Sequence, residues 1–163
     1  MSIIILTGPV ASGKNTIAKI FAQKRERCAV IDIDTVRQMY IHPHKAPWDG
    51  EDGKSQQILG VENACLLAKN FIKNKIDVVI LDVITNETAS FYTNNLGKVK
   101  IVLIMPSYEE TERRFKERQY TISDKEFRML YQWQEEFTAF DEKIDNTVLS
   151  PEETADKINL CVE

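Results

Sequence analysis

A glycine-rich segment near the N-terminus carries the most specific chemical pattern in the sequence. Gly8-Pro9-Val10-Ala11-Ser12-Gly13-Lys14 fits G-x-x-x-x-G-K, with an apolar run before it and a helical run after it. Glycines let the backbone turn so that successive N–H groups point at phosphate oxygens, and a following helix adds the partial positive charge of its N-terminus. Lys14 would contact the β and γ phosphates as a point charge. The pattern predicts a nucleotide phosphate site (a Walker A motif). The alternative is a plain glycine-rich turn with an exposed lysine.

The residue after the lysine departs from this pattern, which normally has Ser or Thr as a Mg²⁺ ligand. Here the position is Asn15, followed by Thr16. An amide oxygen can bind Mg²⁺, which prefers oxygen ligands, but the longer side chain changes the geometry. The hydroxyl of Thr16 could meet the α phosphate. The expected nucleotide-binding residues are therefore Gly8, Val10, Ala11, Ser12, Gly13, Lys14, Asn15 and Thr16.

Aspartates end two of the apolar runs. Asp32 and Asp34 lie at the end of Ala29–Ile33, and Asp82 follows Val78–Leu81. Because residues two apart in a strand point to the same side, we expect Asp32 and Asp34 to share a face at the carboxyl edge, where α/β sheets bind ligands. One carboxylate can hold the water shell of a metal, and another can accept a proton from a hydroxyl. A helix cap is the alternative for Asp34, and an ordinary strand-ending turn is the alternative for Asp82.

Residues 42–53 interrupt the regular pattern and are expected to form a loop. They include Trp48, both histidines of the chain, two prolines and two glycines. Loops of about a dozen residues in a compact chain are usually functional or disordered. Trp48 could stack on a substrate ring or anchor the loop. His42 and His44 are not expected to bind a metal, because no third ligand lies nearby. Arg37, one helical turn after Asp34, could hold a substrate anion.

The rest of the sequence alternates short apolar runs with longer helical segments. The predicted strands are Ile3–Leu6, Ala29–Ile33, Val78–Val83, Val99–Met105 and, more weakly, Thr147–Leu149. Helices are predicted over Thr16–Lys24 and Ser55–Lys75, and after the cap residues Ser107, Ser123 (through about Phe137) and Ser150. β-branched runs without polar alternation suit strands covered on both faces, and the alternation with helices indicates a parallel sheet. A chain of 163 residues buries one core, so a single domain over residues 1–163 is expected.

On the G-x-x-x-x-G-K loop and this element order, the sequence resembles the small P-loop kinases. This group holds the nucleoside monophosphate, shikimate and gluconate kinases and chloramphenicol phosphotransferase. The resemblance covers nearly the whole chain, and only the loop is a specific motif. It implies an α/β three-layer sandwich of the P-loop NTPase type, with a five-stranded parallel sheet in the order 2-3-1-4-5. It also implies ATP- and Mg²⁺-dependent phosphate transfer to a hydroxyl of a small molecule.

The resemblance also implies roles for the acids. Asp34 lies where similar kinases meet the acceptor. Together with Arg37 and Trp48, considered above for their own chemistry, it makes up the expected substrate-binding set. Val78–Asp82 resembles the Walker B strand, whose acid orients Mg²⁺, often through water. The expected metal site is therefore Asn15, Asp32 and Asp82, partly through water.

Similar kinases carry arginines at the base of a lid, where this chain has Arg114 and Arg118 four residues apart on one helix face. The resemblance places Arg114 at the base of ATP and Arg118 at the transferring phosphate, with a short lid at about residues 118–124. A solvated charged helix is the alternative. The candidate catalytic residues are Lys14, Asp34 and Arg118. Asp145–Thr147 and Ser150–Glu153 would then be the last strand and final helix, with a loop that borders adenine or makes an ordinary turn.

Composition restricts the function classes. The net charge is −4 without a long basic run, which argues against binding a nucleic acid polymer. No apolar run approaches the roughly 18–20 residues of a membrane span, so no membrane partner is expected. Cys28, Cys65 and Cys161 are odd in number and widely spaced, which favours free thiols in a reducing cytoplasm.

Two other functions remain open. A nucleoside or nucleotide kinase is disfavoured, because those enzymes usually show Asp-Gly and a proline–arginine pair where this chain has Asp82-Val83-Ile84-Thr85. A non-catalytic nucleotide-binding regulatory module is the alternative of another class. Asn74-Lys75-Ile76-Asp77 matches the base-reading motif of GTPases in spelling, but it precedes the third strand, so we interpret it as a helix-to-strand turn. The acceptor and the oligomeric state are not encoded in any pattern that we recognise.

Overall fold

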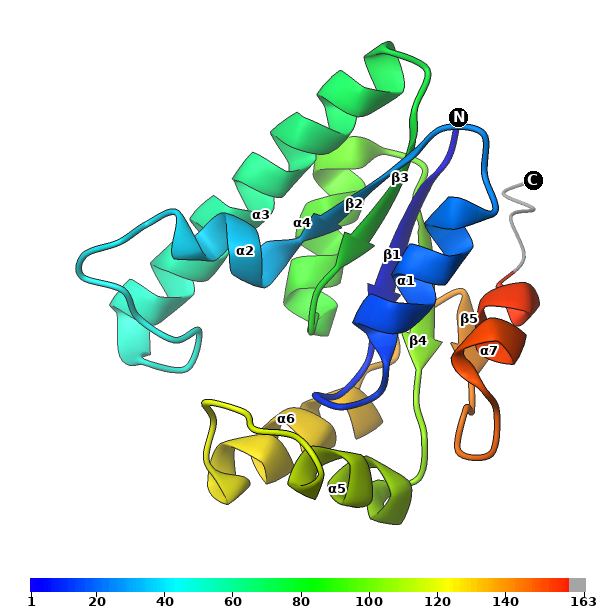
Figure 1. Ribbon diagram of the computed structural model, residues 1–163. Coiled ribbons are helices and arrows are strands. Elements are labelled where there is room, and N and C mark those ends of the chain that lie inside the picture. The colour runs from blue at the N-terminus through cyan, green and yellow to red at the C-terminus, as the bar shows by residue number, and fades with distance from the viewer. Residues whose placement is uncertain (159–163) are drawn as a thin grey trace.

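The computed structural model describes residues 1–158 and builds them around one parallel sheet (Figure 1). The five strands are β1 (Ile3–Thr7), β2 (Cys28–Asp32), β3 (Asp77–Leu81), β4 (Lys100–Ile104) and β5 (Glu142–Ile144). They are hydrogen-bonded in the order β2-β3-β1-β4-β5, and every neighbouring pair is parallel. The predicted fold class and strand order are confirmed.

Seven helices surround this sheet in the described chain. They are α1 (Lys14–Gln23), α2 (Ile33–Gln38), α3 (Gly50–Lys73), α4 (Asn86–Leu96), α5 (Tyr108–Lys116), α6 (Asp124–Glu135) and α7 (Pro151–Lys157). Helices α1 and α7 lie on one face, and α3 and α4 lie on the other (Figure 1). Helices α5 and α6 lie together beyond the carboxyl ends of β1 and β4. None of the helices within residues 1–158 has the length and apolar character needed to cross a bilayer.

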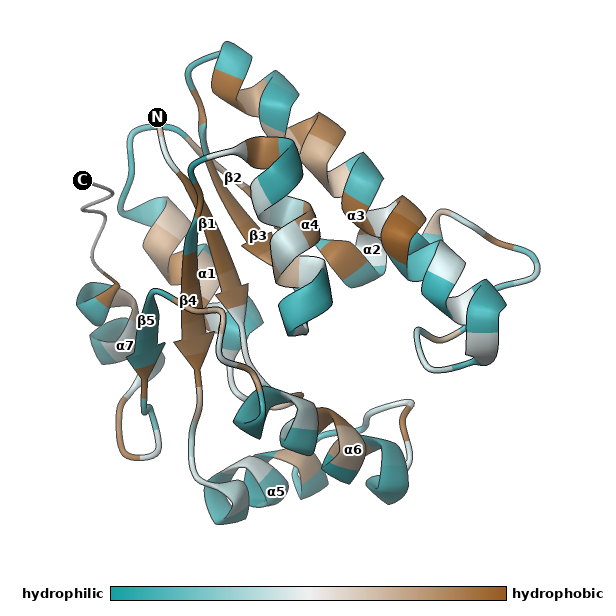
Figure 2. Ribbon diagram, turned by 180° about the vertical axis from the view of Figure 1, so that it is seen from behind, coloured by the Kyte–Doolittle hydropathy of each residue, from teal (hydrophilic) through white to brown (hydrophobic). Residues whose placement is uncertain are grey.

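Alternation along the central strands divides the core into two clusters. Ile3 and Ile5 pack toward α3 and α4, whereas Ile4 and Leu6 pack toward α1 and α7. All five residues of β1 are buried, because both faces of the strand are covered. Figure 2 shows the result, with hydrophobic strands in the middle of the molecule and helices that mix hydrophobic and hydrophilic residues along their length.

Local cap signals mark several helix starts. Ser123 and Ser150 each form a reciprocal capping box with the glutamate three residues later. Ser107 also caps its helix by accepting from the Glu110 N–H, but the Glu110 carboxylate binds arginines and does not return to Ser107. These starts depend on four consecutive residues, which is why the sequence indicates them correctly.

The prediction for the last strand is wrong. Thr147–Leu149 is not a strand, because the Asp145 carboxylate accepts from both the N–H and the hydroxyl of Thr147 and closes a turn. Val148 is 91% exposed. The strand is Glu142–Ile144, a short edge strand with two charged residues that gives no apolar run.

Two further element boundaries, the end of β2 and the start of α3, differ from the predicted ones. β2 ends at Asp32, and the next residue already belongs to α2, so Asp32 and Asp34 do not share a strand face. The expected loop at 42–53 is also too long, because α3 begins at Gly50. Gly53 lies against the preceding loop, where a Cβ would come 2.0 Å from the Ala46 carbonyl oxygen. Cys28 and Cys65 are free thiols, as predicted, and Cys161 lies outside the described residues.

Candidate active site

The loop between β1 and α1 has the backbone shape of an anion site. Gly8 has φ 155° and lies against β4, where a Cβ would come 2.2 Å from the Ile104 carbonyl oxygen. Gly13 has φ 94° and occupies the N-cap of α1, where no side chain accepts from the first N–H groups of the helix. Those N–H groups therefore remain open to an anion, and the helix dipole favours one.

The Lys14 side chain is buried over this loop. Its ammonium donates to the carbonyl oxygens of Gly8 at 3.0 Å and Pro9 at 3.2 Å. Burial lowers the pKa of Lys14, while Asp34, Asp82 and Asp32 act in the opposite direction. Lys14 is therefore not exposed, as it would be if the segment were a plain glycine-rich turn. This ammonium is placed to exchange loop carbonyls for phosphate oxygens.

Asp32, and not Asp34, is the helix cap. The Asp32 carboxylate accepts from the Asp34 N–H at 3.0 Å and from the Asn15 amide nitrogen at 3.0 Å. Asp34 lies in the first turn of α2, with its side chain 73% exposed and 3.8 Å from Arg37. Because the capping task belongs to its neighbour, the Asp34 carboxylate is available to a ligand.

Asp82 is buried at the end of β3. It accepts from the Tyr92 hydroxyl at 2.9 Å, and the Gln57 amide nitrogen lies 3.4 and 3.5 Å from its two oxygens. Burial raises the pKa of Asp82 to about 7, against the opposing effect of the Tyr92 hydrogen bond. A cation placed beside Asp82 would favour its ionised form.

The donor set suits a hard cation such as Mg²⁺. Asn15, Asp32 and Asp82 all offer oxygen ligands, and they line the same cavity. No group of three or more His, Cys, Asp or Glu side chains within residues 1–158 is arranged to hold a metal ion by itself. A Mg²⁺ ion here would therefore take its remaining ligands from water and nucleotide phosphates.

A cavity of about 420 Å³ opens over the glycine-rich loop. Arg118 and the segment that follows it, up to Ile122, line this cavity together with Lys14. The segment connects α5 to α6 and lies close to the loop between β1 and α1 in Figure 1. The structure therefore brings Arg118 and part of the segment expected to form a lid to the cavity over the glycine-rich loop.

Arg114 has a different environment from the one predicted for a base-binding residue. Its guanidinium donates to the carbonyl oxygens of Ser12 at 3.4 Å and Asn146 at 3.1 Å, and to Glu110 at 2.7 Å. Asn146 also donates to the Ser12 carbonyl at 3.0 Å. Arg114 lines neither cavity described here and ties α5 to the glycine-rich loop and to the turn after β5.

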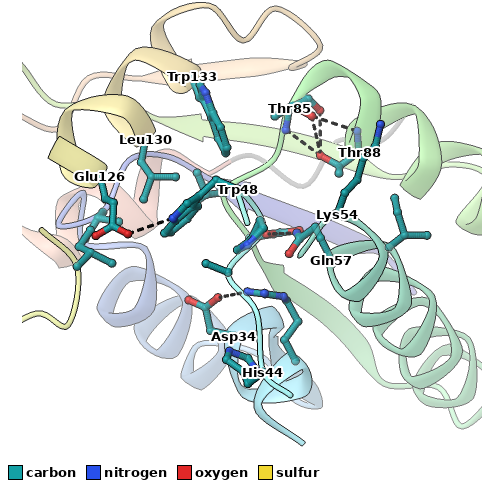
Figure 3. Close-up of a pocket in the computed structure, with 18 of the residues that line it drawn as sticks. Asp34, His44, Trp48, Lys54, Gln57, Thr85, Thr88, Glu126, Leu130 and Trp133 are labelled. Atoms are coloured by element: carbon teal, nitrogen blue, oxygen red, sulfur yellow. Dashed lines mark hydrogen bonds and ion pairs between the residues drawn. The ribbon is translucent and has the colours of Figure 1, made fainter. Parts of the chain in front are cut away.

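A larger cavity of about 660 Å³ adjoins the first. Its walls come from residues 44–48, the start of α3, the segment after β3 and one face of α6 (Figure 3). Six residues line both cavities: Val10, Asp34, Asp82, Val83, Thr121 and Ile122. Asp34 and Asp82 therefore stand at the junction between the two cavities.

Two residues assigned to the substrate have partners in the protein. The Trp48 indole N–H donates to Glu126 at 3.0 Å, and the Trp48 ring lies 6.4 Å from Trp133, so Trp48 both lines the cavity and anchors its loop (Figure 3). The Arg37 guanidinium donates to the Lys45 carbonyl oxygen at 2.7 Å. Arg37 therefore supports the loop and also lines this cavity. His42 and His44 form no metal cluster in the described chain.

Sequence reasoning missed Gln57, Glu126 and Trp133 as lining residues. Glu126, Leu130 and Trp133 are spaced four and three apart, so they lie on one face of α6. Gln57 is a polar residue that continues the buried stripe of α3. The helical spacing of these buried residues was the signal in the sequence that could have identified Gln57. Only the tertiary structure shows that the Gln57 side chain reaches Asp82.

The sheet order, together with a glycine-rich loop between β1 and α1, is the architecture of the small P-loop kinases. No protein-family model and no curated protein matches the sequence. Among solved structures, the chain is similar to a sugar kinase from a Janibacter species, at 12% identity over 96% of this chain and 91% of that chain, with a TM-score of 0.76. It is also similar to shikimate kinase from Aquifex aeolicus, at 17% identity over 94% and 91%, with a TM-score of 0.65. A tunicamycin resistance protein from Deinococcus radiodurans matches at 14% identity over 95% and 91%, with a TM-score of 0.67. At these identities the likeness shows the fold.

Proposed function

We propose that this protein is a kinase that transfers phosphate from ATP, with Mg²⁺, to a hydroxyl of a small molecule. One observation carries the proposal: the phosphate cavity and the larger cavity meet at Asp34 and Asp82. Phosphate transfer needs two adjacent sites with a proton acceptor between them, because catalysis rests on positioning and charge stabilisation.

In this proposal the glycine-rich loop, from Gly8 to Thr16, holds the nucleotide phosphates. Lys14 exchanges its carbonyl partners for the β and γ phosphate oxygens, and Arg118 contacts the transferring phosphate from the lid side. Asn15, Asp32 and Asp82 would hold Mg²⁺, partly through water, which supplies charge neutralisation when bound. The lid at about residues 118–124 excludes water, which would otherwise hydrolyse ATP.

Asp34 is the proposed proton acceptor. The acceptor hydroxyl gives its proton to the Asp34 carboxylate while its oxygen forms the new bond to phosphorus, and the bond between that phosphorus and the ADP oxygen breaks. Asp34 suits this task because its side chain is 73% exposed and its only ion pair in the described chain is long, at 3.8 Å. Asp82 is a poorer base because it is enclosed by Tyr92 and Gln57.

The names of the similar structures support a small-molecule acceptor. They include a sugar kinase and a shikimate kinase solved in complex with shikimate. The expectations of a single domain over residues 1–163 and of an acceptor loop at about residues 42–53 belong to the same proposal. A cytoplasmic location also belongs to it, supported by the free thiols Cys28 and Cys65.

The test is acceptor-dependent ADP release, first from a screen of sugars, amino sugars, nucleosides and hydroxy acids. Lys14→Ala should lower turnover by orders of magnitude, because the ammonium faces the phosphate cavity. Lys19→Ala is the matched control, since Lys19 is exposed on the same helix and lines neither cavity. Unchanged turnover in Lys14→Ala would reject the kinase. Tight ATP binding without any acceptor-dependent ADP release would favour the regulatory module.

A further inference from the structure

The larger cavity has more acidic than basic side chains in its wall. Its carboxylates are Asp34, Glu51, Asp82, Glu87 and Glu126, and its permanent cations are Arg37 and Lys54. Both cations are already paired within the wall. Lys54 lies 3.2 Å from Glu87, and Arg37 lies 3.8 Å from Asp34. Asp82 is buried with its pKa raised to about 7, so Glu51 and Glu126 are the acids that give the cavity a negative potential, which attracts cations and repels acids.

Glu51 and Glu126 are the acids of this wall that stand away from the phosphate site. Neither forms an ion pair with a cation among residues 1–158. Hydrogen bonds from the Ser123 backbone and hydroxyl lower the pKa of Glu126, which keeps it charged at neutral pH. Glu51 is exposed in the first turn of α3. An ammonium group in the cavity would supply these carboxylates with the cation that the protein does not provide.

Aromatic rings lie beside these acids. Trp48 and Trp133 come from opposite walls and meet edge to face at 6.4 Å, and Trp48 donates its N–H to Glu126 (Figure 3). The face of an indole ring attracts a cation, more strongly when water is excluded. The same rings offer apolar area to the flat side of a ligand ring. Carboxylate and indole together form a receptor for an amine on a ring.

Gln57, close to Asp82, has a buried amide oxygen that needs a hydrogen-bond donor. The side chain is only 9% exposed, and its amide nitrogen faces Asp82 at 3.4 and 3.5 Å. The Gln57 Oε1 atom is buried without a donor from the described protein. Because a buried acceptor without a partner is costly, this oxygen calls for a donor from the ligand, such as a hydroxyl or an amine.

We propose that the acceptor is a hydroxylated ring compound that carries an amine and no acidic group. Its reacting hydroxyl lies near Asp34, and its amine lies by Trp48, Glu126 and Glu51. The inference rests on the proposed function only in treating this cavity as the acceptor site. The binding preference itself follows from the cavity wall.

The experiment measures binding, so it does not depend on turnover. The full chain, saturated with ADP, is titrated with glucosamine, glucose and glucuronate, which share a ring and differ in charge. The fluorescence of Trp48 and Trp133, the two tryptophans of the chain, reports occupancy because both line the cavity. We expect glucosamine to bind about tenfold more tightly than glucose, and glucuronate to bind most weakly. The preference should shrink as salt is raised.

Two variants that each remove one negative charge test whether the preference for glucosamine comes from the cavity wall. Glu51→Gln should reduce the preference for glucosamine over glucose severalfold and leave glucose affinity unchanged. Glu62→Gln is exposed on the same helix, does not line the cavity and should change neither. Equal affinities, tighter glucuronate or no glucosamine binding would overturn the inference. A glucosamine preference without phosphate transfer to any acceptor would reject the proposed function and leave only the binding preference of the cavity standing.

Discussion

Replacing Asp34 by Asn separates chemistry from stability at this site. The substitution removes the proposed proton acceptor and keeps the size of the side chain. Losing a positioned base costs about 10²–10⁴ in rate, which corresponds to about 2.7–5.4 kcal/mol of barrier. The stability cost should be smaller, at about 0–1 kcal/mol. The only ion pair of Asp34 in the described chain, with Arg37, is long at 3.8 Å, and the Asp34 side chain is 73% exposed to solvent.

The assay is a pair of measurements on the same preparation. Acceptor-dependent ADP release gives kcat, and denaturant unfolding gives the free energy of unfolding. Asp32→Ala is the matched control, because it removes the cap of α2 and should cost about 0.5–2 kcal/mol of stability. The reasoning fails if Asp34→Asn keeps full turnover. It also fails if Asp34→Asn loses as much stability as Asp32→Ala, since Asp34 would then be structural.

Three further substitutions test other parts of the site. The pKa of Asp82 is raised to about 7 from 3.8, so the folded protein binds an extra proton between these values and its stability should fall as pH rises through that window. Asp82→Asn should remove this contribution, seen as a flatter melting temperature from pH 4 to 7; an unchanged slope would mean that Asp82 is not the titrating group. Trp48→Phe removes the hydrogen bond to Glu126 but keeps an aromatic ring. The KM for the acceptor should rise roughly 2–10-fold, in line with about 0.5–1.5 kcal/mol for one hydrogen bond. An unchanged KM would show that this hydrogen bond does not order the loop. Asn15→Ser, too short to reach Asp32, should leave the Mg²⁺ affinity measured by titration equal or higher, and a large loss would show that the amide is required.

Features that depend on neighbouring residues were predictable from the sequence. Gly8, Gly13 and Lys14 stand at fixed offsets between a strand and a helix, so the loop follows from local backbone geometry. The capping boxes at Ser123 and Ser150 are equally local. The alternation of apolar runs and helices indicated the parallel sheet, whereas its strand order was implied by the resemblance to the small P-loop kinases, and both agree with the structure.

Assignments at the ends of elements were less secure. Asp32 and Asp34 are equivalent in the sequence, and only the position at which β2 ends makes the first one the cap. Thr147–Leu149 has the composition of a strand, but Asp145 turns the chain there, and the charged residues of β5 pair with β4 instead. An edge strand is paired on one side only and remains partly exposed, so it can contain charged residues and is hard to predict from composition.

The glycine-rich loop, the parallel class of the sheet and the aspartates near its carboxyl edge could be predicted from the sequence alone, because each depends on residues close together in the chain. The surroundings of the second cavity could be found only in the folded structure. Trp48 meets Glu126 across 78 positions of sequence, and Gln57 meets Asp82 across 25. Arg114 is held by the carbonyl oxygens of Ser12 and Asn146, which no helical spacing indicates. Such contacts depend on how separate elements pack around the sheet, and local propensity carries no information about that packing.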